Sequence, residues 1–187
     1  MKPFSESLRY EYPLTPESKV LDVGCFEGNW SHEIWKRYGC HVVAMEPILE
    51  FYWRCVRKLQ PVGCTVLPYA LGAKSRVETF KIHGDMSGIM ADGESERVHV
   101  IGIEDLMRQL EWDHIDLLKL NCEGMEFEIL EKVISWEFAP MVTNLQIQFH
   151  NNIPDAFMRR ALIQEKLSDT HNCQFDEPFC WEGWKLK

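Results

Sequence analysis

Two glycines near the start of the chain have the type and spacing of residues that hold a nucleotide. Gly24 ends the apolar run VLDV, and Gly28 follows four residues later in the stretch VLDVGCFEG. A glycine directly after a strand lets the backbone approach a ligand closely, and the free N–H groups of the next helix favour negative charge. The stretch therefore predicts a ligand-binding turn between a strand and a helix, with an ordinary βα turn as the plainer alternative.

The spacing of this turn separates two classes of nucleotide. A dinucleotide-binding motif has a middle glycine beside the pyrophosphate, at the position where this chain has Phe26. A ligand that carries a carboxylate in place of a pyrophosphate fits the pattern better. A nicotinamide-dependent dehydrogenase is thus an alternative that the spacing argues against.

An acidic residue at the end of the next apolar run extends this prediction. Glu46 ends HVVAME, 24 residues after Asp22, near the roughly 20-residue offset at which an acid reaches a ribose. A carboxylate can accept hydrogen bonds from both ribose hydroxyls, although an acid that merely begins a helix is also common. The turn and Glu46 together indicate a cofactor that contains a nucleoside.

These residues have to be positioned by alternating strands and helices. Short apolar runs predict strands at 19–23, 41–46, 64–70, 114–121 and 141–150, with further β runs at 76–83, 96–103 and in the tail. Amphipathic stretches predict helices at 29–38, 49–59, 104–110, 125–134 and 154–167, the last with Pro154 in its first turn. The alternation predicts an α/β fold with a Rossmann-like, doubly wound, mostly parallel sheet and helices on both faces.

The composition fits one packed domain. Of the 187 residues, 45% are hydrophobic, and we expect an N-terminal cap segment over 1–18 and a single domain over 19–187. The net charge of −9 makes a nucleic-acid backbone a poor partner, and no apolar run is long enough to cross a membrane. The seven cysteines have no zinc spacing and no signal peptide is visible, so we expect reduced thiols and a cytoplasmic protein.

Several stretches, taken in order, resemble one family of enzymes. VLDVGCFEGNW followed by VVAMEP is similar to the first motif and the acidic motif of class I S-adenosylmethionine-dependent methyltransferases. DLLKLNCEGMEFEIL resembles the K-x-D-x-E-G-x-E motif of FkbM-type methyltransferases, with Lys119, Glu123, Gly124 and Glu126 in place. IGIEDL and PYALGAKS are similar to two further elements of that family. The resemblance extends from residue 19 to about residue 150.

The resemblance implies a cofactor and its contacts. Asp22, Gly24 and Gly28 would line the methionine part of S-adenosylmethionine, and Ala70 would lie against the adenine. The residues that we assign to the cofactor are Asp22, Gly24, Cys25, Phe26, Gly28, Glu46, Pro47, Ala70 and Asn121. The family fold further implies a seven-stranded sheet with an antiparallel last strand, which WEGWKLK would supply.

Two positions depart from the family pattern. Asn121 stands where the family has Asp, and Gln148 stands where an acid is usual, two residues before His150. Hard divalent cations prefer anionic oxygens, so Mg²⁺ is disfavoured, although Glu123 still offers one carboxylate. We assign no metal ligand.

The residues expected to carry catalysis are His150, Glu123 and Asn121. Methyl transfer depends mainly on alignment, and a base assists a hydroxyl nucleophile by typically 10²–10⁴-fold. His150 is the preferred base because it would end a central strand and titrate near neutrality, but it could equally bind a neighbouring loop. Glu123 and Glu126 could position the substrate or cap the helix that follows.

Three other ionisable residues receive weaker assignments. Lys119 lies inside a buried strand, so we expect it either to extend its ammonium to the surface or to pair with Glu123 or Asp116, and not to be catalytic. His83 and Asp85 lie at a glycine-rich segment that is either a lid over the acceptor or, more simply, a hairpin loop without a role.

The sequence thus predicts an S-adenosylmethionine-dependent methyltransferase that methylates a hydroxyl of a sugar or small molecule and releases S-adenosylhomocysteine. The expected partner is this acceptor, with no nucleic acid and no membrane, and the short chain leaves room for a homodimer that completes the site. The alternative is a protein of the same fold that binds the cofactor without turnover, which the amides of Asn121 and Gln148 motivate.

Overall fold

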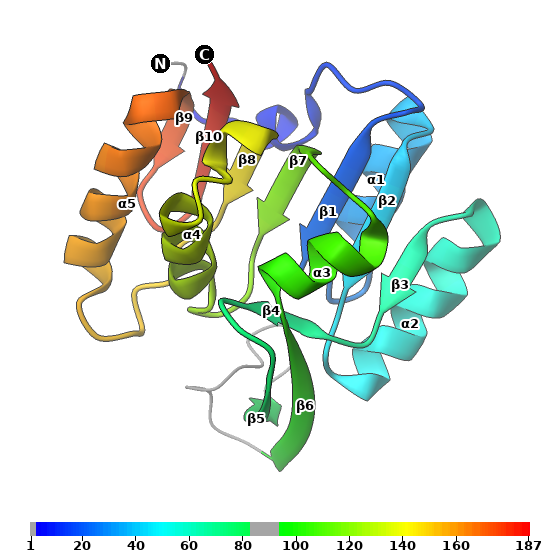
Figure 1. Cartoon of the computed structure of the whole chain (residues 1–187). Helices are drawn as coiled ribbons and strands as arrows, with labels where there is room; N and C mark the ends of the chain where they lie inside the picture. The colour runs from blue at the N-terminus through cyan, green and yellow to red at the C-terminus, as the bar shows by residue number, and fades with distance from the viewer. Residues whose placement is uncertain (1–2, 83–93) are drawn as a thin grey trace.

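A seven-stranded sheet forms the centre of the computed structural model, which describes residues 3–82 and 94–187 (Figure 1). Its strand order is β3-β2-β1-β7-β8-β10-β9. In chain order the strands are β1 (Lys19–Val23), β2 (His41–Met45), β3 (Thr65–Leu67), β7 (Ile115–Leu120), β8 (Val142–Ile147), β9 (His171–Glu177) and β10 (Trp181–Leu186). The pairs from β3 to β8 are parallel, whereas β10 is antiparallel to both of its neighbours. The predicted mostly parallel sheet and the antiparallel last strand are confirmed.

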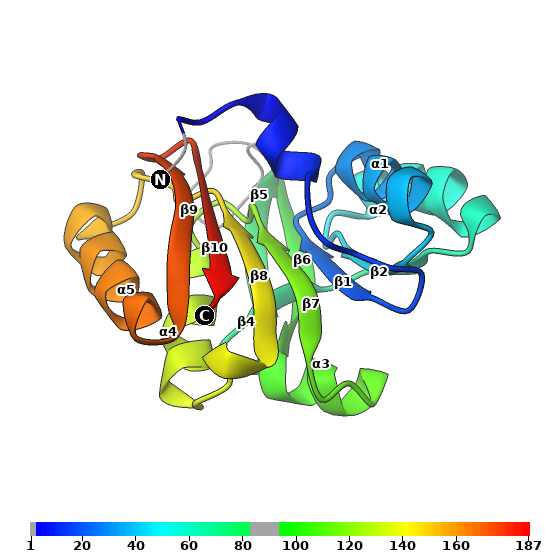
Figure 2. The same ribbon diagram turned by 90° about the horizontal axis from the view of Figure 1, so that it is seen from above.

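Helices cover both faces of this sheet, as predicted. The helices are α1 (Asn29–Tyr38), α2 (Leu49–Leu59), α3 (Ile103–Leu110), α4 (Glu126–Ser135) and α5 (Ala156–Thr170). Seen from above, α1 lies on one side of the central strands and α3 and α4 lie on the other (Figure 2). Adjacent residues of β7 contribute to separate clusters, because Leu117 packs with the apolar residues of α1 and Leu118 with those of α3 and α4. Burial on both faces explains why these strands read as continuous apolar runs.

A smaller sheet completes the fold beside the carboxyl ends of the central strands. It contains β4 (Ala70–Gly72), β5 (Arg76–Ile82) and β6 (Glu94–Gly102) in the order β4-β6-β5. Figure 1 shows it below the large sheet. His83, Asp85 and most of the glycine-rich segment lie outside the described residues.

Three sequence-based boundaries are wrong, each for a local reason. The single strand expected at 64–70 divides into β3 and β4 at Pro68, since proline has no N–H with which to continue the ladder. Pro154 precedes the N-terminal cap residue of α5, Asp155, and so is not in the first turn. Residue His150 lies three positions beyond β8, and its N–H donates to Glu126 instead of to a neighbouring strand.

The N-terminal segment packs on the same side as α1. A 3₁₀ helix spans Glu6–Tyr10, and the carbonyl of Arg9 accepts a hydrogen bond from the Trp30 indole at 3.1 Å. Tyr12 donates its hydroxyl to the buried Gln146 at 2.8 Å, and burial raises the pKa of this phenol. No described helix is both long and apolar enough to cross a membrane.

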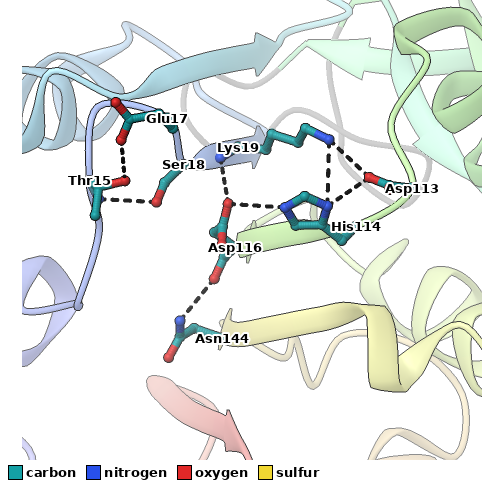
Figure 3. A network of polar contacts seen from close by, with 8 residues as sticks. All are labelled: Thr15, Glu17, Ser18, Lys19, Asp113, His114, Asp116 and Asn144. Atoms are coloured by element: carbon teal, nitrogen blue, oxygen red, sulfur yellow. Dashed lines mark hydrogen bonds and ion pairs between the residues drawn. The ribbon is translucent and has the colours of Figure 1, made fainter.

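Polar side chains at the amino ends of the central strands bind one another (Figure 3). The Asp116 carboxylate accepts the Lys19 backbone N–H at 2.7 Å, and the Asp116 carbonyl accepts from Asn144 at 2.8 Å. The Lys19 ammonium lies 3.0 Å from Asp113, which also contacts His114 at 2.7 Å. These contacts connect β1, β7 and β8 at the end of the sheet opposite to the predicted site.

Candidate cofactor and acceptor site

A cleft of about 240 Å³ opens at the carboxyl ends of β1, β2 and β7. This is where the strand order reverses, the position at which doubly wound sheets bind ligands. Of the residues assigned to the cofactor, the cleft is lined by Gly24, Phe26, Glu46, Pro47, Ala70 and Asn121. Of the expected catalytic residues, Asn121 and Glu123 line it, while His150 lies behind Glu123.

The Gly24 turn has a steric origin that the sequence did not indicate. Gly24 has φ 73°, and a Cβ there would lie 1.9 Å from the carbonyl oxygen of Asn121. The glycine is therefore required by the neighbouring β7 backbone and not by a ligand, although Gly24 does line the cleft. Gly28 has φ 70° and precedes α1, and a Cβ there would lie 2.9 Å from Leu59, away from the cleft.

Asp22 supports the turn from behind and does not line the cleft. It is fully buried, and its carboxylate accepts from the Ser31 hydroxyl at 2.5 Å and lies 2.7 Å from the Lys119 ammonium. The same ammonium donates to the Gly24 carbonyl at 2.8 Å. The expected pairing of Lys119 with Glu123 or Asp116 is wrong, because the strand register places Lys119 directly opposite Asp22.

The two residues after Gly24 face in different directions. The Cys25 thiol lies 3.3 Å from the Cys55 sulfur beneath the turn, and burial raises its pKa well above the usual value. Phe26 has φ 51°, and its ring packs against the Phe51 ring on the cleft wall, with the centroids 4.6 Å apart and the planes tilted by 58°. Cys25 thus belongs to the packing beneath the turn, and Phe26 belongs to the cleft.

Glu46 is held with its carboxylate at the cleft. One oxygen accepts the Phe26 N–H and the other accepts the Ile48 N–H, each at 3.0 Å. Glu46 is only 6% exposed, and burial raises the pKa of its carboxyl to about 7 despite these two bonds and the nearby Lys119 charge. Each oxygen retains a second lone pair, so the carboxylate can still accept from ribose hydroxyls.

Apolar side chains that the sequence analysis missed form much of the remaining wall. Tyr69 and Leu71 flank Ala70, Phe80 comes from the small sheet and Met125 follows β7. The first two could have been found from their neighbour Ala70. No local signal marks Phe80, because it reaches the cleft only through the packing of the second sheet.

Asn121 lines the cleft and carries an unsatisfied polar atom. Its backbone N–H donates to the Val23 carbonyl at 3.1 Å, which fixes the residue beside the Gly24 turn. Its side-chain oxygen is buried, and no group in the described part of the chain binds it. Leaving such an atom without a donor costs about 1–3 kcal/mol, and a ligand N–H or O–H that reached this oxygen would remove that cost.

Glu126 and His150 join the loops after β7 and β8 behind the cleft. Glu126 is fully buried, and its carboxylate accepts from the Gly124 N–H at 2.9 Å and from the His150 N–H at 2.7 Å. The imidazole places Nδ1 at 2.9 Å from Glu126 Oε1 and Nε2 at 3.0 Å from Glu123 Oε1. His150 thus bridges two carboxylates.

The expected titration of His150 near neutrality is wrong. Burial alone would lower its pKa, but the hydrogen bonds and charges of Glu123 and Glu126 raise the pKa to about 10. This shift favours the imidazolium at pH 7, a form that has no free lone pair to receive a proton. Among the described residues, no group of three or more His, Cys, Asp or Glu is arranged to hold a metal ion.

Comparison with known proteins identifies the family. The model of the methyltransferase FkbM domain matches residues 22–175. The chain belongs to the FkbM methyltransferase family. No curated protein matches the sequence.

Solved structures with the same fold include methyltransferases with different acceptors. An rRNA methylase from Streptococcus thermophilus has TM-score 0.51 and 13% identity, over 92% of this chain and 89% of that one. A precorrin-6y C5,15-methyltransferase from Geobacter metallireducens has TM-score 0.53 and 10% identity, over 96% and 84%. The METTL16 methyltransferase domain has TM-score 0.55 and 11% identity, over 97% and 65%.

These structures establish the fold and leave the acceptor open. The fold is that of class I methyltransferases, which implies S-adenosylmethionine as the methyl donor. One of the three proteins is an rRNA methylase by name, so the fold does not support the expectation that nucleic acid is excluded. The acceptor has to be argued from the cleft itself.

Proposed function

We propose that this FkbM-family protein transfers a methyl group from S-adenosylmethionine to a hydroxyl of a sugar or another small molecule. The observation that carries the proposal is the composition of the cleft wall. Its charged residues are Glu46 and Glu123, and the cleft of the described structure has no arginine, lysine or histidine on its lining. This wall is apolar and acidic.

The cofactor fits the residues that follow β1, β2, β3 and β7. Glu46 would accept the ribose hydroxyls, the Asn121 side-chain oxygen would accept a donor from the cofactor, and the backbone around Gly24 would contact its methionine part. Ala70 with Tyr69 forms an apolar wall suited to an adenine. When bound, S-adenosylmethionine supplies the methyl group and a thioether leaving group.

The charge of the cleft favours a neutral acceptor. S-adenosylmethionine has a positive sulfonium centre, which the carboxylates of Glu46 and Glu123 would stabilise. A phosphate placed in the same cleft would meet those carboxylates with no cation from the described wall to offset them. A hydroxyl instead finds a hydrogen-bond acceptor in Glu123, which argues for a sugar over a nucleic-acid backbone.

Two measurements test this proposal. Titration calorimetry should show that the purified protein binds S-adenosylhomocysteine. Radiolabelled S-adenosylmethionine should methylate members of a panel of neutral methyl hexosides and deoxyhexosides, and should not methylate the corresponding hexose phosphates or RNA oligonucleotides. Absence of cofactor binding would remove the proposed activity, while cofactor binding with methylation of RNA or of none of the neutral sugars would overturn the acceptor class.

A further inference from the structure

The two carboxylates that His150 bridges face different environments. Glu126 is fully buried and both of its oxygens accept N–H groups, so it has no access to a substrate. Glu123 lines the cleft, with Oε1 at 3.0 Å from His150 Nε2. Within the described chain no side chain or backbone group binds the second oxygen of Glu123. That oxygen is the free acceptor of the bridge.

The backbone at Glu123 is held in an unusual conformation. Glu123 has φ 55° and Gly124 has φ 105°, so two successive residues adopt positive φ directly after β7. For a residue with a side chain this conformation costs about 1–2 kcal/mol. The bonds from His150 to Glu123 and from Gly124 to Glu126 offset that cost and fix the side chain at the cleft.

The charge on His150 decides which member of the bridge can accept a proton. Both ring nitrogens face carboxylate oxygens within 3.0 Å, and the ring does not line the cleft. An imidazolium in this setting donates two hydrogen bonds and cannot act as a base. The remaining member of the bridge that could contact an acceptor hydroxyl and receive its proton is the Glu123 carboxylate, since Glu46 is held by two backbone N–H groups at the end of β2.

We propose that Glu123 is the catalytic residue that binds the acceptor hydroxyl and takes its proton, and that His150 is a positioning residue anchored by Glu126. This inference rests on the proposed function. As the acceptor oxygen bonds to the methyl carbon, the carbon–sulfur bond breaks and leaves its electron pair on sulfur. The hydroxyl proton passes to the free oxygen of Glu123, which becomes a neutral carboxylic acid and returns the proton to solvent after the product leaves.

Glu123→Gln tests the catalytic role, because glutamine keeps the size of the side chain and an oxygen for His150. We expect its affinity for S-adenosylhomocysteine to stay within about threefold of that of the unaltered protein, while turnover of the best methyl hexoside falls about 10²-fold or more. Glu123→Asp, which keeps the charge, should retain more turnover than Glu123→Gln. Glu165→Gln, on the exposed face of α5, is the matched control for the change in charge and should leave both quantities unchanged.

Nuclear magnetic resonance of ¹³C- and ¹⁵N-labelled histidine tests the positioning role without an acceptor. The His150 ring should show both nitrogens protonated at pH 8, and Glu123→Gln should lower the pH at which it titrates. Turnover of Glu123→Gln within threefold of the unaltered protein would overturn the catalytic assignment and leave the proposed function intact. A neutral His150 ring at pH 8 would overturn the positioning role, and failure to bind S-adenosylhomocysteine would remove the proposed function together with this inference.

Discussion

The two ends of the central sheet use the same kinds of polar residue for different purposes. At the amino ends, Lys19, Asp113 and Asp116 bind one another and the neighbouring backbone (Figure 3). At the carboxyl ends, Glu46 and Asn121 line a cleft and are fixed by backbone hydrogen bonds, but their side chains keep unused acceptor capacity. The first arrangement connects strands, and the second leaves groups for a ligand.

Burial differs between the two ends as much as pairing does. The Asp113 side chain is 86% exposed, whereas Asp22 and Lys119 beneath the cofactor turn are almost completely buried. Exposed ion pairs are screened by water and salt, while a buried charge depends on its partner. Stability should therefore be most sensitive to substitution beneath the ligand-binding end.

Replacement of the buried Lys119 should cause the largest loss of stability. Lys119→Met leaves the fully buried Asp22 without its 2.7 Å partner and removes the donor to the Gly24 carbonyl. Removal of one member of a buried pair typically costs about 3–5 kcal/mol, so we expect a loss of this order in the free energy of unfolding measured with urea. Lys19→Met at the opposite end is the matched control and should change stability little; equal losses would contradict the comparison.

Substitution of Gly24, the glycine of the cofactor turn, should cause the next largest loss of stability. Gly24→Ala places a Cβ against the Asn121 carbonyl and adds the strain of φ 73°. Gly39 has a similar φ of 65°, but beyond its own chain neighbours no atom of the described residues lies within 4 Å of its Cβ position. Gly39→Ala should therefore cost only the conformational strain of about 1–2 kcal/mol, and Gly24→Ala should cost a further 1–3 kcal/mol from the clash. Denaturant unfolding of the two variants measures this difference, and equal values would show that β7 adjusts freely.

The sequence predicted best what is determined locally. The bounds of β1, α1 and α2 agree with the structure because apolar periodicity, Gly39 directly after α1 and Pro61 shortly after α2 are local signals. Glu46 was assigned to the site because it directly follows a strand, and strand ends meet at one edge of a parallel sheet. These are consequences of short-range pattern and of fold class.

What the sequence did not reveal depends on contacts between distant elements. The pairing of Lys119 with Asp22 follows from β1 and β7 being neighbours, which only the strand order determines. Phe80 reaches the cleft through a second sheet. The raised pKa of His150 requires two carboxylates to converge on one ring, and their positions along the chain carry no sign of that convergence.

Glu46 should make cofactor binding depend on pH. Burial raises the pKa of its carboxyl from 4.5 to about 7, so the free protein should lose stability relative to Glu46→Gln as the pH rises through that interval. Cofactor hydroxyls favour the ionised form, so affinity for S-adenosylhomocysteine should rise from pH 6 to pH 8. Calorimetry should show about tenfold weaker binding by Glu46→Gln at pH 8, with little dependence on pH. A pH-dependent affinity that persists in the variant would exclude Glu46 as its source.

The smallest loss of stability should come from breaking the exposed Lys19–Asp113 pair at the amino ends of the strands. The Lys19 and His114 hydrogen bonds hold the pKa of the Asp113 carboxyl well below its usual range, so its contribution to stability is present at neutral pH and is lost as the pH falls through that lowered pKa. Asp113→Asn should therefore lower the midpoint of thermal unfolding only slightly at pH 7 and low salt, and not at all at 1 M salt, where an exposed pair is screened. A loss at pH 7 that persists in high salt would mean that Asp113 acts through geometry instead of charge. The amino-end network would then resemble the buried pair beneath the cleft, and the contrast between the two ends of the sheet would rest on ligand access alone.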